Sequence, residues 1–179
     1  VVDQRNTPGA WSLMGYGNYL NNGNTPPNYS VYDKYYLGWL EPEVLAQTKT
    51  LEIPADGQTT YMLASNEKHV VDGACRTDTV YYIENRQQEG WDAYLPGHGM
   101  LIWRVIFNEE DWHQNCPNDY VARYRLISAK KTSSPYTTTK PKPEVPFPGS
   151  SNVTEYAPFS HNKIENIQET NGLITCDFI

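Results

Sequence analysis

Short runs rich in aromatic and β-branched residues constrain the fold of this 179-residue chain more than any other feature. Such residues favour strands because their side chains pack well on a pleated, half-buried surface. Strands are predicted at residues 48–53, 60–64, 79–84, 100–107, 121–129, 164–167 and 173–178. Asn171-Gly172 is typical of a tight turn between the last two. We therefore predict an α+β fold, mostly antiparallel β and sandwich-like, with one short helix on the N-terminal side.

That helix is expected near residues 30–38. Ser30 can cap its first turn, and Asp33 suits the positive end of the helix dipole. Gly38 and Pro42 end the pattern. An aromatic face that we expect to pack in the core recurs at helical spacing, at Tyr32, Tyr35, Tyr36 and Trp39. The Pro-, Thr- and Ser-rich stretch 131–151 is expected to form an exposed extended loop.

Composition excludes some classes of function. The net charge is −7 and the sequence pI is about 5.0, so the chain does not attract the phosphates of nucleic acid. No apolar run is long enough for a transmembrane segment. Three cysteines do not make a disulfide framework. A Cys75–Cys116 pair is conceivable, and buried free thiols are the simpler expectation.

The most distinctive local motif is Trp-Ser-Leu-Met-Gly-Tyr-Gly at residues 11–17. A Met in a tight turn flanked by glycines is how a methionine turn looks, with Met14, Gly15 and Tyr16 at its centre. In metzincin-like zinc peptidases this turn lies below the metal and gives its imidazole ligands an apolar floor. By itself the motif is also common in ordinary loops.

The order of further motifs adds to this interpretation. They occupy residues 11–17, 21–27, 32–34, 37–40, 82–87, 90–92 and 95–103, and they resume at 166–167 and 172–178. This series resembles the immune inhibitor A family of secreted bacterial zinc metallopeptidases, in its Bacteroides-type form. After Trp103 relatives often carry His and Asp, where this chain has Arg104 and Val105, so any role of that pair is doubtful in this chain.

The resemblance implies a zinc-binding His-Glu-x-x-His helix that precedes the methionine turn, with the Glu activating a zinc-bound water. No such motif occurs in the chain, whose four histidines are scattered. The first residues look like the middle of a longer protein. We therefore expect the missing helix upstream, with residues 1–45 as the end of the catalytic domain and residues 46–179 as a β-rich portion packed on it.

Four other residues are candidates for the cleft or for structural roles. Alternation along a strand places Glu84 and Arg86 on one face, where they can pair, and Glu84 is also a conceivable general base. Asp92 is expected to accept backbone N–H groups in its turn. His98, between two glycines, can reach a substrate or metal, or hydrogen-bond a turn.

An oxygen-rich stretch at residues 108–119 is the weak calcium candidate, through Asp111 and Asp119. Its spacing does not match an EF-hand loop, and solvated loop carboxylates are the simpler interpretation. Cys116 near His113 lacks the third group that would orient a thiol nucleophile.

Two classes of function stay open. The first is the C-terminal part of a secreted or cell-surface bacterial peptidase that cleaves peptide bonds in proteins. Its partners would be the upstream part of the same protein and the substrate, and the chain alone would be inactive. The second is a β-sandwich module that binds glycans or peptides through aromatic side chains. A degenerate peptidase kept as an interaction scaffold is a further alternative.

Overall fold

The computed structural model describes residues 8–64, 68–71, 73–119, 121–131 and 141–179. Two mainly antiparallel sheets and a hairpin account for most of the regular structure, so the predicted mostly antiparallel α+β fold is confirmed. The strands are β1 (Glu43–Val44), β2 (Lys49–Ile53), β3 (Tyr61–Ala64), β4 (His69–Val71), β5 (Ala74–Arg76), β6 (Thr79–Arg86), β7 (Gly99–Ile106), β8 (Tyr124–Ile127), β9 (Ile164–Thr170) and β10 (Leu173–Phe178). The helices are α1 (Val31–Tyr36) and α2 (Glu109–His113), and short 3₁₀ turns lie at Gly9–Trp11, Gly17–Gly23 and Gly90–Asp92.

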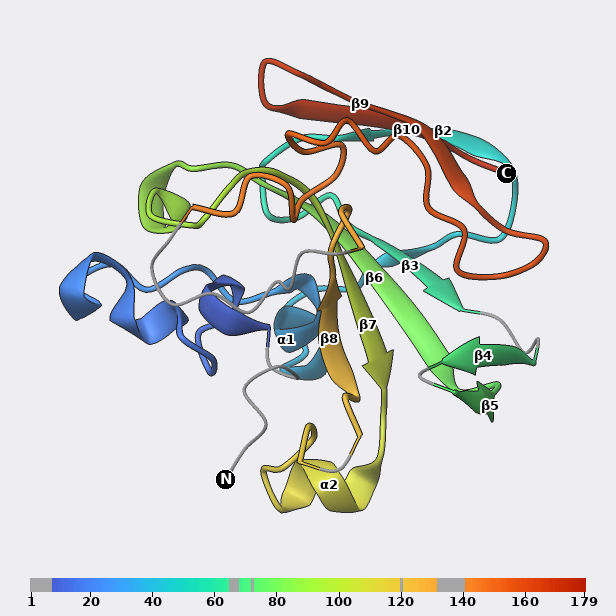
Figure 1. Cartoon of the computed structure of the whole chain (residues 1–179), viewed down its shortest axis with the longest axis horizontal. Helices are drawn as coiled ribbons and strands as arrows, with labels where there is room; N and C mark the ends of the chain where they lie inside the picture. Colours follow the sequence, from blue (N-terminus) through green and yellow to red (C-terminus); the bar gives the residue numbers. More distant parts are fainter. Residues whose placement is uncertain (1–7, 65–67, 72, 120, 132–140) are drawn as a thin grey trace.

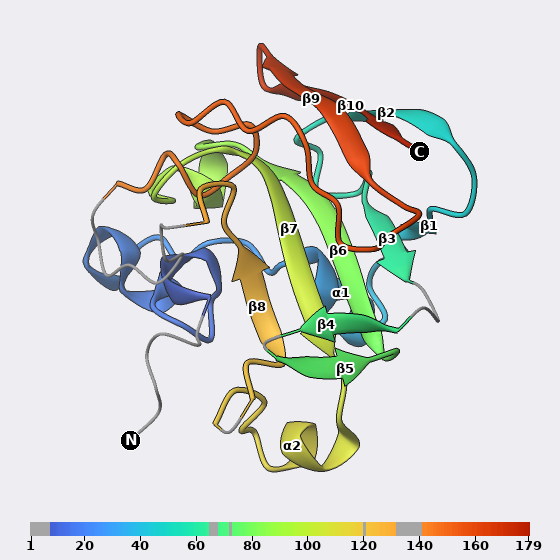
Figure 2. The ribbon, with the colours of Figure 1, turned by 45° about the vertical axis from the view of Figure 1, so that its right-hand side comes forward.

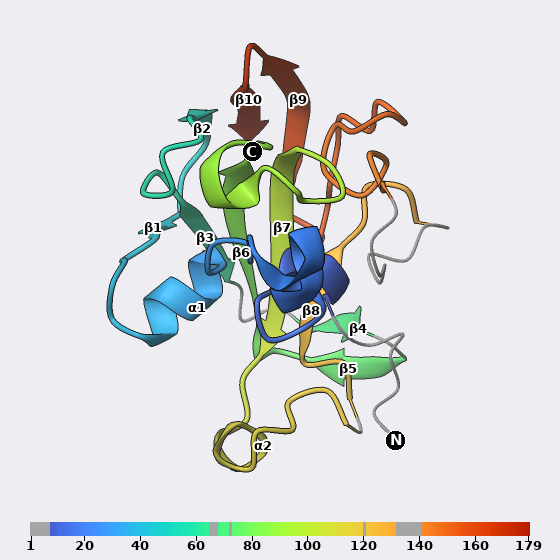
Figure 3. The same ribbon diagram turned by 90° about the vertical axis from the view of Figure 1, so that its left-hand side faces the viewer.

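The five-stranded sheet has the order β1-β3-β6-β7-β8, with only β1 parallel to its neighbour. A second sheet, β2-β10-β9, lies across one end of it (Figure 1). The β4–β5 hairpin lies near the opposite end, close to β6 and β7 (Figure 2). In Figure 3 the 3₁₀ turns at 9–23 lie in front of β7 and β8, α1 lies to their left, and the β4–β5 hairpin lies to the right of β8.

Strand alternation gives the large sheet an apolar side chain set on each of its two faces. On β7, Met100 and Ile102 belong to the core beneath the second sheet, whereas Leu101 and Trp103 belong to the core beneath α1 and the N-terminal segment. Trp11 and Trp103 are both completely buried in that second core. The N-terminal segment is therefore packed on the β-rich portion through shared apolar contacts.

The turn at Asn171-Gly172 forms as predicted. Both residues have positive φ, 51° and 78°, as a two-residue turn between paired strands requires. β9 extends to Thr170, three residues beyond the predicted end. The short strands β1, β4 and β5 and the helix α2 were not predicted, because each has too few residues to show a period.

The predicted aromatic face is partly wrong. Tyr32 is buried, but Tyr36 is 54% exposed and Trp39 is 63% exposed. The helix ends at Tyr36, and Gly38 at φ 73° turns the chain, so Trp39 leaves the helical face and meets Tyr29 edge to face.

The prediction of an exposed loop at 131–151 is also partly wrong. Residues 132–140 lie outside the described residues. Beyond them, Val145 and Phe147 are buried, and Phe147 pairs with Met100 of β7. Apolar side chains between prolines thus return this segment to the core.

The start of α1 agrees with the sequence. The Ser30 hydroxyl accepts the backbone N–H of Asp33 at 3.1 Å, and the Asp33 carboxylate accepts the Ser30 N–H at 3.1 Å, which makes a capping box. Ser30 is completely buried, and its hydroxyl also lies 2.7 Å from the Tyr124 hydroxyl on β8. One side chain therefore begins the helix and attaches it to the sheet.

Replacing Ser30 by Ala should lower the free energy of unfolding by about 2 kcal/mol, because a helix cap and a buried hydrogen bond are lost together. Ser151→Ala, at an exposed position, should change it by less than about 0.5 kcal/mol. Urea unfolding measures both. A double-mutant cycle with Tyr124→Phe should be non-additive; strict additivity would contradict the Ser30–Tyr124 contact.

Candidate functional site

The predicted methionine turn is a compact loop held by its own backbone. Tyr16 N–H donates to Gly9 O at 2.8 Å, and the N–H groups of Gly15 and Gly17 both donate to Ser12 O, at 3.1 and 3.0 Å. A Cβ atom on Gly15 would lie 2.4 Å from Gly9 O, and one on Gly17 would lie 2.5 Å from Ser12 O. Both glycines are therefore required by close backbone approach.

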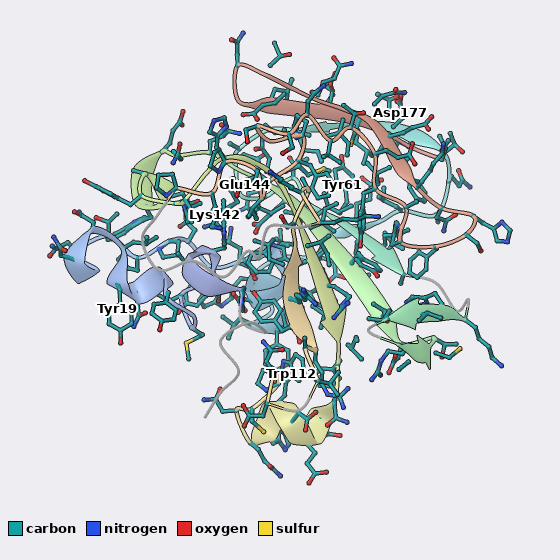
Figure 4. All side chains as sticks on the ribbon, viewed as in Figure 1. Tyr19, Tyr61, Trp112, Lys142, Glu144 and Asp177 are labelled. Carbon is teal, nitrogen blue, oxygen red and sulfur yellow. The ribbon has the colours of Figure 1, made fainter. Side chains whose placement is uncertain are left out.

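Met14 projects from this turn into solvent, with 77% of its surface exposed. It borders a hollow of about 220 Å³ between the turn and the loop that joins α2 to β8. Ser12 and Gly15 lie on one wall, and Cys116, Asn118 and Asp119 lie on the other. The structure thus brings Met14 and Gly15 beside Asp119, one of the two calcium candidates. Tyr16 does not border the hollow and contacts Tyr19 instead, whose side chain is labelled in Figure 4.

Tyr124 is the residue that links this hollow to the interior. Its ring stacks on Trp103 with a centroid distance of 5.4 Å and an interplanar angle of 19°. Burial, and then the charge of Asp33, raise the pKa of the Tyr124 phenol well above its ordinary value, so it stays protonated. Asn118 pairs with the Tyr124 backbone in both directions at 2.9 Å, which fixes the strand beside the hollow.

Behind Trp103 lies a buried charged cluster. Trp103 Nε1 donates to Glu84 Oε1 at 2.7 Å, and Arg86 Nη1 lies 3.4 Å from the same oxygen. Glu84 Oε2 has no hydrogen-bond partner among the described residues. Burial raises the pKa of Glu84, although Arg86 and Trp103 act in the other direction. Glu84 is 1% exposed and does not line the hollow beside Met14, so its surroundings fit a structural role and not a base in a cleft.

Arg86 joins this cluster to two loops. Its Nε donates to Asp92 Oδ2 at 2.7 Å, and its Nη2 contacts Asp92 Oδ1 and donates to Asn28 O at 3.1 Å. Asp92 in turn accepts the Asn28 backbone N–H at 2.9 Å. The backbone group that Asp92 binds therefore comes from a distant segment, and not from its own turn as expected.

The charges of the pair shift both pKa values. Burial would lower the pKa of Arg86, but Glu84 and Asp92 outweigh it and raise that pKa. Burial would raise the pKa of Asp92, but Arg86 and Asn28 outweigh it and lower that pKa. Both groups are thus charged across the neutral pH range.

His98 lies on the surface and does not border the hollow beside Met14. Its Nδ1 lies 2.7 Å from Glu169 Oε1 on β9, and 51% of its side chain is exposed. Its partner is a carboxylate and not the turn backbone. The contact of His98 with Glu169 therefore joins the loop before β7 to the second sheet.

The described residues do not fit a metal ion. Among them, no group of three or more His, Cys, Asp or Glu side chains is arranged to hold one. Asp111 forms an ion pair with Arg123, so the two calcium candidates, Asp111 and Asp119, do not act as a pair of ligands. The three cysteines are free, and only Cys176 is buried, so the expectation of buried thiols holds for one of them.

The sequence did not predict the roles of Tyr124, Asn118 and Asn28, although Asn118 lies in the oxygen-rich stretch that was the weak calcium candidate. Tyr124 stands in a predicted strand, and alternation with Leu126 signals that both face the same side. Asn118 and Asn28 lie in loops, where no period shows which backbone a side chain will contact.

Comparison with known proteins gives no identification: no family model, curated protein or solved structure matches the chain. In the part of the chain that the structure describes, none of the helices has the length and apolar character to cross a membrane.

Replacing Asp92 by Asn should lower the free energy of unfolding at pH 7 by about 3–5 kcal/mol, because buried Arg86 loses the closer of its two anionic partners and keeps only Glu84. The folded-state pKa of Asp92 is lowered, so its contribution is present above the unfolded value of about 4 and is lost as the pH falls through the folded value. The difference between wild type and variant should therefore shrink at low pH in denaturant titrations. Glu89→Gln, an exposed charge in the same turn, is the control and should have little effect. A pH-independent difference would contradict this assignment.

Proposed function

We propose that this chain is the C-terminal part of a secreted zinc metallopeptidase that hydrolyses peptide bonds in proteins. In this proposal the chain contributes the floor and one wall of the zinc cleft and has no activity by itself. The zinc ligands and the catalytic Glu would come from polypeptide upstream of the methionine turn.

The observation that carries the proposal is the position of Met14. Met14 is 77% exposed although it lies on a turn whose backbone is fixed and requires glycine at two positions. Such exposure is unusual for a large apolar side chain on an ordered turn. Beneath it, the loop is attached to the sheet through buried Trp11 and Ser12. An exposed apolar side chain that is held in place beside a hollow is suited to being covered by another part of the protein. In a methionine turn, that covering part is the zinc site.

The described residues of this chain do not form a zinc site by themselves, so the chain would contribute support to the cleft and not ligands to the metal. That support has a visible basis behind the turn. Tyr124, Trp103 and Glu84 are joined by a ring stack and a hydrogen bond, which would hold the floor of a cleft in place.

The test is to express the product of the whole reading frame and this chain separately, and to measure zinc content and hydrolysis of an unfolded protein such as casein. The longer protein should bind zinc and lose activity in a chelator, whereas this chain should do neither. A reading frame without a His-Glu-x-x-His motif would refute a catalytic parent and leave the degenerate scaffold.

A substitution at Met14 tests whether this side chain supports the zinc site or has no role in it. In this chain Met14→Ala should change the free energy of unfolding by less than about 0.5 kcal/mol, because the side chain is exposed. In the longer protein it should lower zinc affinity or kcat about tenfold or more. Val44→Ala, at an exposed residue of β1, is the control and should leave both unchanged. Equal zinc affinity and kcat in wild type and Met14→Ala would contradict the proposal that Met14 forms the floor of the zinc cleft.

A second candidate function is a glycan- or peptide-binding module. One observation favours it: a groove of about 290 Å³ lies between α1 and the sheet, lined by Tyr35, Tyr36, Tyr82 and Phe107. Tyr36 and Phe107 are half exposed, with ring centroids 6.3 Å apart and tilted by 43°. That tilt is less suited to stacking one flat sugar ring than a coplanar pair. Glycan-array binding that Tyr36→Ala abolishes would favour this alternative over the peptidase.

A further inference from the structure

The groove between α1 and the large sheet is lined mostly by aromatic rings. Its volume of about 290 Å³ is near the lower end of the range for small-molecule sites. The rings belong to five residues: Tyr32, Tyr35 and Tyr36 of α1, Tyr82 of β6, and Phe107 just after β7. No residue that lines this groove also lines the hollow beside Met14, so the two are separate sites.

The five rings contact one another in a continuous series. The Tyr82 ring contacts those of Tyr32 and Tyr35, at centroid distances of 5.3 and 5.7 Å. The Tyr36 ring contacts those of Tyr32 and Phe107, at 6.1 and 6.3 Å. The planes of these pairs are tilted by between 35° and 59°, so the rings form a curved wall and not a flat platform. A curved wall suits a compact, rounded group better than a flat ring.

The series runs from the core to the surface. Tyr32 and Tyr82 are buried, whereas Tyr36 and Phe107 are half exposed. Packing therefore fixes the inner rings, and the outer pair lies where a ligand can enter from solvent. Val80 and Val105 complete the apolar lining.

The charges at this groove favour a cation. Asp78, which precedes β6, is the one carboxylate among the described residues of the lining, and none of these residues is cationic. Asp78 Oδ2 lies 3.5 Å from Arg76 Nη1, but 54% of the Asp78 side chain is exposed, so solvent weakens this ion pair. The net charge of −7 adds a negative potential over the whole chain.

The inner tyrosines lie in the same negative surroundings. Burial raises the pKa of the Tyr82 phenol well above its ordinary value, and Tyr35 and the charge of Glu41 raise it further. Burial and then Tyr82 raise the pKa of the Tyr32 phenol, and the charge of Asp33 acts in the same direction. Nearby carboxylates that disfavour a phenolate favour a cation at the same place.

The lining also distinguishes between kinds of cation. A primary ammonium group has three N–H donors, and most of them would lose their hydrogen bonds to water in an aromatic groove. A quaternary ammonium group has no N–H donor, and its charge is attracted to the faces of aromatic rings. A small groove with five rings and one half-exposed carboxylate therefore fits a quaternary ammonium head.

We propose that this groove, which we call the tyrosine groove, binds a small organic cation with a quaternary ammonium head, held by the five rings and by the charge of Asp78. Such a ligand differs from the glycans and peptides of the alternative function. The proposal does not rest on the peptidase function.

The experiment compares two probes of one shape by NMR titration of the chain. Choline has a quaternary ammonium head, whereas 3,3-dimethylbutan-1-ol has carbon in place of the nitrogen and is neutral. Choline should shift the resonances of Val80 and Val105 and saturate, and its affinity should fall as salt is added. The neutral alcohol should bind at least about tenfold more weakly, because it lacks the attraction between a cation and the ring faces.

Tyr36→Leu removes a half-exposed ring and keeps an apolar side chain that suits a helix. It should weaken choline binding by about threefold to tenfold and change binding of the neutral alcohol much less. Tyr94→Leu is the same change at a half-exposed tyrosine outside the groove, and it is the control that should have no effect.

Asp78→Asn tests the contribution of the carboxylate. It should weaken choline binding by about threefold and reduce the dependence of the affinity on salt, because one attractive charge is lost. Glu89→Gln removes an exposed charge outside the groove and should leave choline binding unchanged.

Three results would each overturn the proposal: equal affinity for choline and the neutral alcohol, no saturable shifts with choline, or unchanged choline affinity in Tyr36→Leu or Asp78→Asn. Glycan binding without choline binding would also overturn it and would favour the glycan-binding module. Because the probes need no zinc and no upstream sequence, choline binding with an inactive longer protein would retain the tyrosine groove and reject the peptidase. The opposite pair of results would do the reverse.

Discussion

The ion pair between Arg86 and Asp92 is the interaction on which the N-terminal half of the structure depends. Arg86 ends β6, and Asp92 lies in the short turn before β7. Between them they bind the backbone C=O and N–H of Asn28, just before α1. A loop that has no strand partner is therefore held to the sheet by the buried charges of two side chains. A buried ion pair adds little net stability over apolar packing, but it specifies one arrangement, because any other leaves a charge unpaired.

From this pair a continuous set of contacts reaches the methionine turn. Arg86 contacts Glu84, Glu84 accepts the Trp103 N–H, and Trp103 stacks on Tyr124. The Tyr124 hydroxyl is hydrogen-bonded to Ser30 at the start of α1 and to Ser12 in the loop that carries Met14. Apart from the contact of Arg86 with Glu84 within β6, each step joins two different elements of the fold. The apolar face of the sheet thus has a polar line through its centre, and that line fixes the geometry of the exposed loop that carries Met14. A packed core of Leu and Ile would bury as much area without setting that geometry as narrowly.

How much of this could be predicted differs from one element to the next. The strands β6 and β7 and the turn at Asn171-Gly172 were predictable, because period-two alternation and turn chemistry are local signals. The partnership of Glu84 with Arg86 also followed, since both lie on one face of one strand. The contact of Asp92 with Asn28 did not, because it joins residues 64 positions apart through a loop. The burial of Phe147 was missed for the same reason: a Pro-rich composition indicates a loop, but it does not show that apolar residues inside the loop return to a strand 47 residues earlier.

The two faces of the large sheet differ in the way they use charge, and this difference follows from the register. On one face, Arg86 has carboxylates from its own strand and the adjoining turn, so the positive charge is neutralised inside the fold. On the other face, the register of β7 with β8 sets Arg104 opposite Arg125, and both arginines also take part in other polar or electrostatic contacts. Shifting β8 by one residue would turn Arg125 toward the α1 side and remove Leu126 from its core, so packing of Leu126 beside Trp103 keeps the two cations on the same face. The apolar core of one face thereby determines which charged side chains meet on the other face.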